Sequence, residues 1–109
     1  MKDIISYEDF TKLDLRIGTI ISGEPVAKSD KLLVLEVDLG DHTRQIVAGI
    51  GKTYQVSDLI NKQVLIVTNL APRSLMGYDS QGMILAVSES DGPILISPEK
   101  EVSTGREVK

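Results

Sequence analysis

The sequence is dominated by short runs of β-branched and aliphatic residues, and turn-forming residues separate these runs from one another. Five runs have the length of a strand, and a fragment follows them: 15–22, 32–39, 43–50, 63–70 and 83–88, with 94–96 as the fragment. Glycine, proline and aspartate occupy the intervals, for example Gly23 to Pro25, Gly40 to His42 and Asp91 to Pro93. The pattern predicts an all-β protein with five main strands.

The remaining segments predict two short helical elements. Ser6 followed by Asp9 resembles a capping box and indicates an N-terminal helix over about Tyr7 to Lys12. Residues 56–60 predict a helical turn that Ser57 or Asp58 can cap. Three strands, a helical element and two further strands follow the order of the five-stranded Greek-key barrel called the OB-fold. We therefore expect a single OB-fold domain over residues 1–109, with a short N-terminal helix and a C-terminal extension.

Composition limits what this domain can contain. A chain of 109 residues fits one domain and should bury roughly 65% of the surface that it exposes when unfolded. Because it has no cysteine and His42 is its only histidine, a disulfide and a cysteine-ligated metal site are excluded. No apolar run approaches the roughly 20 residues that cross a bilayer, and the first ten residues carry four charges. We expect a cytoplasmic protein that does not bind membranes.

Alternation along the strands indicates how the faces are used. In the run from Leu33 to Leu39 the odd positions are apolar, so Glu36 and Asp38 should face water. Other runs carry apolar residues on both faces: Ile17 with Ile20, Leu65 with Ile66, and Ile84 with Leu85. Since a small barrel has one interior, the second apolar faces would be covered by the N-terminal helix, the C-terminal segment or another subunit. We expect a homodimer.

Patterns that suggest catalysis are incomplete. Residues 51–53 read like the end of a phosphate-binding P-loop, but Ile46 stands where that motif requires glycine. Ser80 lies in a stretch that resembles a nucleophile elbow with one residue too many, and His42 beside a turn is the only available base. Glu36 and Asp38 lack a third oxygen ligand for a cation. We therefore expect no catalytic residues, no cofactor and no metal.

Charge is distributed unevenly along the chain. The net formal charge is −4, yet the stretch from His42 to Tyr78 has a net charge of +3, contributed by Arg44, Lys52, Lys62 and Arg73 against Asp58. Arg73 falls in the predicted loop between the fourth and fifth strands, a loop that OB-folds use to contact nucleic acids. With only four aromatic residues, a platform that stacks successive single-stranded bases is hard to build. The sequence favours a folded RNA read through its backbone and shape.

Five segments resemble one known family. They read FTKLDLRIG from Phe10, DKLLVLEVDLG from Asp30, RQIVAGI from Arg44, NLAPRSLMG from Asn69 and SQGM from Ser80. These segments are similar to the tRNA-binding domain that occurs at the C-terminus of methionyl-tRNA synthetases, as a separate small β subunit, and in cytokine-like synthetase cofactors. The resemblance covers about residues 10–108 and implies an OB-fold with terminal extensions that is usually homodimeric and binds tRNA by shape.

The resemblance also implies a set of RNA-binding residues. It places four polar side chains at the RNA surface: Asn69, Arg73, Ser80 and Gln81. It places Met76 and Met83 beside them, and it makes Lys31 and Arg44 phosphate contacts. Asp14 and Arg16 are expected to form a structural ion pair. The family often has a basic residue after Pro-Arg, where this chain has Ser74, so affinity should be modest.

Two functions follow from the resemblance. The first is a non-catalytic tRNA-binding module that strengthens tRNA binding by methionyl-tRNA synthetase, whose catalytic part would then be a further partner. The alternative is a chaperone-like or protein-interaction module of the same fold. Secretion-chaperone relatives lack the Ser-Gln-Gly-Met sequence that starts here at Ser80, which favours the synthetase branch.

Overall fold

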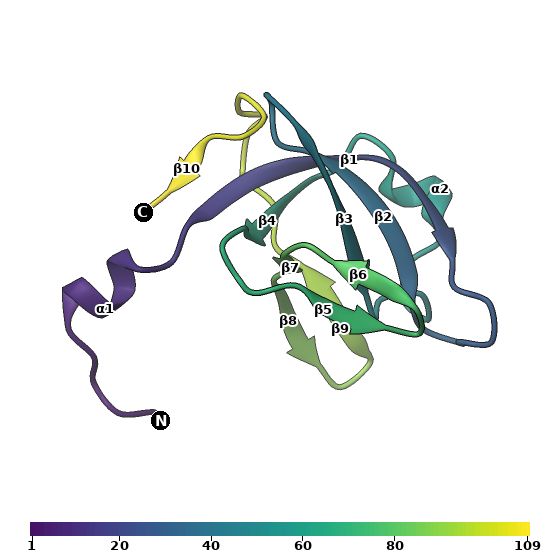
Figure 1. The fold of residues 1–109 in the computed structure, drawn as a ribbon, viewed down its shortest axis with the longest axis horizontal. Helices are drawn as coiled ribbons and strands as arrows, with labels where there is room; N and C mark the ends of the chain where they lie inside the picture. The colour runs from purple at the N-terminus through teal and green to yellow at the C-terminus, as the bar shows by residue number, and fades with distance from the viewer.

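The computed structural model describes residues 1–109 and consists mainly of strands, as the sequence predicts. Figure 1 shows the elements in chain order: α1 (Tyr7–Thr11), β1 (Leu15–Pro25), β2 (Leu33–Asp38), β3 (Thr43–Ala48), α2 (Val56–Leu59), β4 (Gln63–Val67), β5 (Arg73–Leu75), β6 (Tyr78–Ser80), β7 (Met83–Ile84), β8 (Ala86–Glu89), β9 (Gly92–Leu95) and β10 (Glu107–Val108). Neither helix, at five and four residues, has the length and apolar character needed to cross a membrane.

The main sheet is nearly closed into a barrel around the long strand β1. Its strand order is β3-β2-β1-β4-β7, and all of its pairings are antiparallel, with β10 added beside the start of β1. The register with β2 shifts between Ile20 and Ser22, an irregularity of the kind that bends a strand. Gly23 lies so close to the side chain of Leu35 that a Cβ atom would overlap it. These features bend β1, which pairs with β4 along its first half and with β2 along its second half in an OB-like barrel.

The core fills this barrel and confirms the predicted alternation in β2. Ten apolar residues form the main cluster: Ile20, Leu33, Leu35, Val37, Leu39, Ile46, Ile50, Leu59, Val64 and Ile66. Glu36 is exposed, as expected, whereas Asp38 is half-buried and its carboxylate accepts a hydrogen bond from the Gly40 amide at 2.8 Å. Side chains from β1, β2, β3, β4 and α2 therefore close a single interior.

The hairpin of β5 and β6 is the main element that the sequence analysis missed. Met76 and Gly77 both have positive φ values, 51° and 87°, which suit a two-residue hairpin turn. The hairpin packs over Val34 and Val47 and forms a second apolar cluster with them. Arg73 thus lies on a strand and not in a loop. The hairpin covers Val34 and Val47 on the face of β2 and β3 that points away from the barrel interior.

Other boundaries also differ from the prediction. The fifth predicted strand, 83–88, is divided at Leu85 into β7, which pairs with β4, and β8, which pairs with β9. The position before α2 is Gln55 and makes no side-chain cap, so the expectation of a cap from Ser57 or Asp58 was wrong. At α1 the expected cap is present, because the Ser6 hydroxyl accepts from the Asp9 amide at 3.0 Å.

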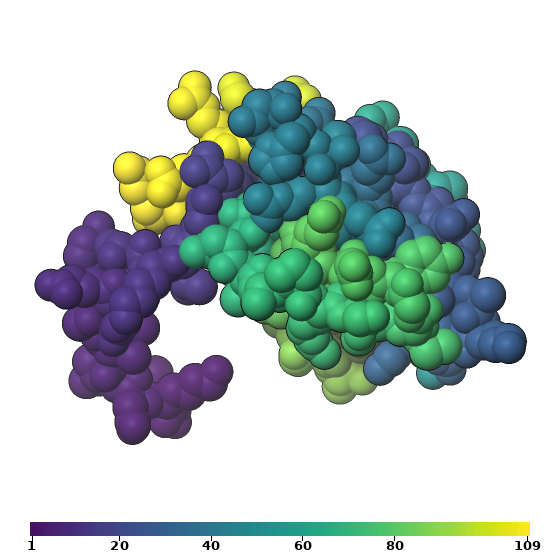
Figure 2. Space-filling model, in the orientation of Figure 1, coloured from purple at the N-terminus to yellow at the C-terminus, as the bar shows by residue number.

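The first 13 residues form an arm that extends away from the barrel, as the purple segment in Figures 1 and 2 shows. No residue of α1 is buried. The arm exposes the apolar side chains of Ile4, Ile5, Tyr7, Phe10 and Leu13. The apolar face of this helix therefore has no partner within the chain.

Candidate nucleic-acid interface

The β5–β6 hairpin is fixed to β3 by two glutamines. The Gln81 amide donates to the Gln45 carbonyl at 2.8 Å, and the Gln45 amide donates in return to Oε1 of Gln81 at 3.0 Å. Nε2 of Gln45 also donates to the Asp79 carbonyl at 2.9 Å. Gln81 is exposed, so its remaining amide N–H groups face solvent at the base of the hairpin.

Ser80 braces the same junction from inside. Its residue is only 5% exposed, and its hydroxyl accepts from the buried Val47 amide and donates to the Gly82 carbonyl, both at 3.0 Å. The hydroxyl proton is therefore directed at a backbone carbonyl. The family resemblance implies that this hydroxyl lies at the RNA surface, but in the structure it is buried and links β3, β6 and the turn before β7.

Arg44 is half-buried and connects three segments. Its Nε donates to Nε2 of His42 at 3.1 Å, and Nη1 donates to the carbonyls of Thr68 and, at 3.4 Å, Gln81. The His42 proton then lies on Nδ1, which is 2.6 Å from Oδ1 of Asp41. This hydrogen bond lowers the pKa of the Asp41 carboxyl. The second terminal nitrogen of Arg44 keeps its donors available for a ligand.

Asn69 is the residue after Thr68, whose carbonyl accepts a hydrogen bond from Arg44. Both polar atoms of the Asn69 side chain bond to the backbone where the N-terminal arm meets β1. Oδ1 accepts from the Asp14 amide at 2.8 Å, and Nδ2 donates to the Lys12 carbonyl at 2.6 Å. Thr68 adds a hydroxyl bond to the Asp14 carbonyl at 2.9 Å. The end of β4 therefore fixes the base of the N-terminal arm.

The expected ion pair of Asp14 and Arg16 is present. Nε of Arg16 is 2.8 Å from Oδ1 of Asp14, and Nη1 donates to the Gly105 carbonyl at 3.2 Å. The hydrogen bond and charge of Asp14 raise the pKa of Arg16. The pair thus links the start of β1 to the C-terminal segment.

The other four predicted site residues are exposed, as Gln81 and Asn69 are. Arg73 pairs with Ser80 across the hairpin, and Met76 stands at its tip with 55% of its surface accessible. Met83 lies on β7 and is 41% exposed. Lys31 is in the β1–β2 loop, next to Leu32, which packs into the cluster beneath the hairpin. Figure 2 shows the hairpin in green across one face of the molecule.

The basic stretch from His42 to Tyr78 does not form one patch. Lys52 pairs with Asp30 at 3.0 Å, and this contact lowers the pKa of the Asp30 carboxyl. Lys62 precedes β4, whereas Asn69 follows it, so the two lie toward opposite ends of that strand. Only Arg44 and Arg73 of the four cations lie at the hairpin.

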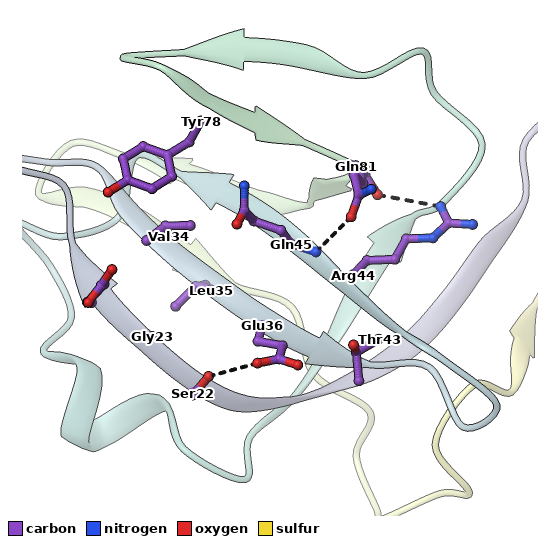
Figure 3. A pocket seen from close by; sticks show the side chains of 11 residues that line it. Ser22, Gly23, Val34, Leu35, Glu36, Thr43, Arg44, Gln45, Tyr78 and Gln81 are labelled. Carbon is purple, nitrogen blue, oxygen red and sulfur yellow. Dashed lines mark hydrogen bonds between the residues drawn. The ribbon is translucent and has the colours of Figure 1, made fainter.

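A cleft with a volume of about 550 Å³ opens between the hairpin and the sheet (Figure 3). Its lining comes from β1, β2, β3, β6 and the residue after β6. Side chains at the cleft include Ser22, Glu36, Arg44, Gln45, Tyr78 and Gln81. The sequence predicts Glu36 to face water and offers too few oxygen ligands for a cation there, and without the β5–β6 hairpin the cleft could not be anticipated.

Comparison with known proteins places the chain among tRNA-binding domains. The family described as "Putative tRNA binding domain" matches residues 15–107. The chain is 55% identical over 106 residues to a methionine–tRNA ligase of Methanococcoides burtonii, covering 95% of this chain and 16% of that protein. It is 44% identical over 107 residues to that of Thermococcus onnurineus, covering 98% and 15%. The chain thus spans about one-sixth of the length of these relatives.

Solved structures that superpose on this chain share its fold but are named for two different roles. A "MetRS related protein" from Pyrococcus horikoshii superposes with a TM-score of 0.92 at 31% identity, over 99% of this chain and all of that one. A "chaperone CsaA" from Bacillus anthracis superposes with a TM-score of 0.89 at 33% identity, over 98% of this chain and all of that one.

Proposed function

Because the chain belongs to this tRNA-binding domain family, we propose that it is a non-catalytic module that holds tRNA for methionyl-tRNA synthetase, as its C-terminal domain or as a β subunit. The observation that carries the proposal is the grouping of Arg44, Arg73 and Gln81 at the base of one hairpin. We expect the module in the cytoplasm, together with the synthetase and its tRNA.

The residues divide into two roles under this proposal. Contacts to RNA come from the exposed groups, with Arg73, Arg44 and Lys31 on phosphates, Gln81 on backbone, sugar or base, and Met76 and Met83 against sugar or base surfaces. Ser80 and Asn69 act by holding the hairpin and the arm in place, because their polar atoms are used within the protein. Recognition then depends on a rigid surface and not on a row of stacked bases.

A tRNA titration monitored by fluorescence anisotropy tests the proposal. If each subunit makes about four phosphate contacts, affinity should fall roughly a hundredfold between 50 and 200 mM salt, and eight contacts across a dimer should give a fall of about ten-thousandfold. An unstructured RNA of equal length and charge serves as the control and should bind more weakly. Equal affinity for the two RNAs, or affinity independent of salt, would contradict reading by shape and backbone.

The proposal includes a homodimer. The arm exposes apolar residues that nothing in its own chain covers, among them Ile4, Ile5 and Tyr7. An apolar groove runs between Ile17 and Leu65 of the barrel and Val108 of β10, and a second copy of the arm is its proposed occupant. Two copies would present two hairpins to a single tRNA, which explains why the salt dependence could reach the steeper of the two values.

A chaperone-like role is the second candidate, favoured by the similarity to proteins named chaperone CsaA. Arg73→Ala separates the two candidates. The tRNA-binding role predicts weaker binding of tRNA by a folded variant. The chaperone-like role predicts that the capture of an unfolded polypeptide is unchanged by Arg73→Ala and that wild-type protein binds tRNA no better than other polyanions.

A further inference from the structure

The cleft beneath the hairpin has a chemistry that a phosphate-binding surface does not need. Ser22, Glu36 and Gln45 are direct partners across β1, β2 and β3, so their side chains share one face of the sheet. Tyr78 and Gln81 approach this row from the other side of the cleft, as Figure 3 shows. A volume of about 550 Å³ is within the range of small-molecule sites.

The cleft is lined by both acidic and basic side chains. Glu24 and Glu36 are exposed and neither is among the ion pairs of the protein. Oε2 of Glu36 accepts from the Ser22 hydroxyl at 3.3 Å, which leaves its second oxygen without a protein partner. Along β2, Glu24 lies beside Val34, Glu36 comes next, and Arg44 lies beside Val37, so Glu36 stands between Glu24 and Arg44. The carboxylates repel a phosphate and Arg44 attracts one, so Glu36 suits a ligand group that donates hydrogen bonds and carries no negative charge.

We propose that this cleft binds one unpaired guanine of the RNA, with the Watson–Crick edge of the base on Glu36. The inference rests on the proposed tRNA-binding function. Guanine is the base that presents two adjacent N–H donors, at N1 and N2, to a single carboxylate. Adenine, cytosine and uracil each place a ring nitrogen acceptor or carbonyl oxygen next to their donor, and a carboxylate repels that group. Glu36 therefore selects guanine by both attraction and repulsion.

Other lining groups complete the recognition. Oε1 of Gln81 is bonded to the Gln45 amide, so Nε2 of Gln81 can donate to the O6 carbonyl of guanine. The half-buried ring of Tyr78 supplies an aromatic surface for the base. The free nitrogen of Arg44 takes the phosphate of the same nucleotide. The cleft thus offers an acceptor, a donor and a cation for the three parts of one guanine nucleotide.

Nucleotide titrations of the whole chain, followed by amide shifts in NMR spectra, test the proposal. Guanosine 5′-monophosphate is compared with inosine 5′-monophosphate, which lacks only the N2 amino group, and with adenosine 5′-monophosphate. Wild-type protein should bind the guanine nucleotide about tenfold more tightly than either competitor, since a hydrogen bond to a charged group is lost in both. The affected amides should be those of Ser22, Gln45 and Gln81.

Two matched variants locate the selectivity. Glu36→Gln should remove the tenfold preference, because an amide no longer accepts from two donors. Glu24→Gln removes the same charge from the same cleft and should keep the preference. The Tm of both variants should lie within a few degrees of that of wild type, because both glutamates are exposed. The proposal would be overturned by any of three results. Glu36→Gln could keep the preference for the guanine nucleotide, or Glu24→Gln could lose it to the same extent. The cleft amides of the wild-type protein could also respond equally to all three nucleotides.

A tRNA titration of the same proteins distinguishes this inference from the proposed function. If wild-type protein binds tRNA but shows no preference for the guanine nucleotide, the guanine site is wrong and the tRNA-binding role stands. If wild-type protein does not bind tRNA, the proposed function is wrong.

Discussion

Replacing Ser80 with alanine should destabilise the protein by about 2 kcal/mol. The hydroxyl of Ser80 is buried and is the acceptor of the Val47 amide. Without it, a buried N–H group has no partner, which costs about 1–3 kcal/mol. The Gly82 carbonyl also loses its donor, but Gly82 is half-buried and water can replace the hydroxyl there at a small cost. The midpoint of this range is a substantial part of a typical domain stability of about 5–15 kcal/mol.

Thermal unfolding followed by circular dichroism measures this effect. For a domain near this size, about 2 kcal/mol lowers Tm by roughly 8 °C. Ser74→Ala is the matched control, because Ser74 lies exposed on the partner strand of the same hairpin, and it should change stability by less than about 0.5 kcal/mol. At a temperature where all variants are folded, Ser80→Ala should bind tRNA better than Arg73→Ala does. A Ser80→Ala protein with unchanged Tm and tRNA affinity as low as that of Arg73→Ala would refute the assignment of Ser80 as an internal brace.

The remaining predictions concern other contacts. Arg73→Ala should reduce the slope of log affinity for tRNA against log salt by about 0.9, while Lys62→Ala, at the far end of β4, should leave it unchanged; equal effects would contradict the interface. Lys52 lowers the pKa of Asp30 in the folded state, so wild type should have a larger free energy of unfolding in urea than Asp30→Asn. This difference should be full above about pH 5 and shrink as pH falls through the lowered pKa. A difference that grows on acidification would contradict the ion pair. Gly105→Ala should lower the free energy of unfolding far more than Gly77→Ala. Both glycines have positive φ values, 89° and 87°, a conformation that costs alanine about 1–2 kcal/mol. Only at Gly105 would the new Cβ atom also overlap a backbone carbonyl, that of Leu39. If the proposed dimer forms through the arm, Ile5→Asp should give a monomer in light scattering, whereas Lys2→Asp in the same arm should not; a monomeric wild type would contradict the dimer.

The parts of the fold that were predictable have strong local signals. The alternation from Leu33 to Leu39 identifies the core face of β2 without further information, and the Ser6 and Asp9 spacing gives the start of α1. The β5–β6 hairpin has no such signal, because Arg73, Ser74, Asp79 and Ser80 are poor strand formers. Its stability comes from packing on Val34 and Val47, a contact between distant segments that local pattern cannot predict.

The site was only partly predictable, for a related reason. The resemblance identifies Asn69, Ser80 and Gln81 as a group, and the structure brings all three close to Arg44 or the hairpin base. A motif cannot tell whether a polar side chain faces solvent or bonds to its own backbone, and for Asn69 and Ser80 it is the latter. Summing charge along the chain likewise fails for Lys52, since its partner Asp30 comes from another loop.

The most direct test of the account is the footprint of tRNA on the protein, measured by hydrogen exchange of the free chain and of the complex. The account predicts protection at the β5–β6 hairpin, at the start of β3 around Arg44 and in the β1–β2 loop at Lys31. Residues around Lys62 and α2 should exchange at unchanged rates. Protection centred on α2 and the turn before β4, with the hairpin unaffected, would contradict it.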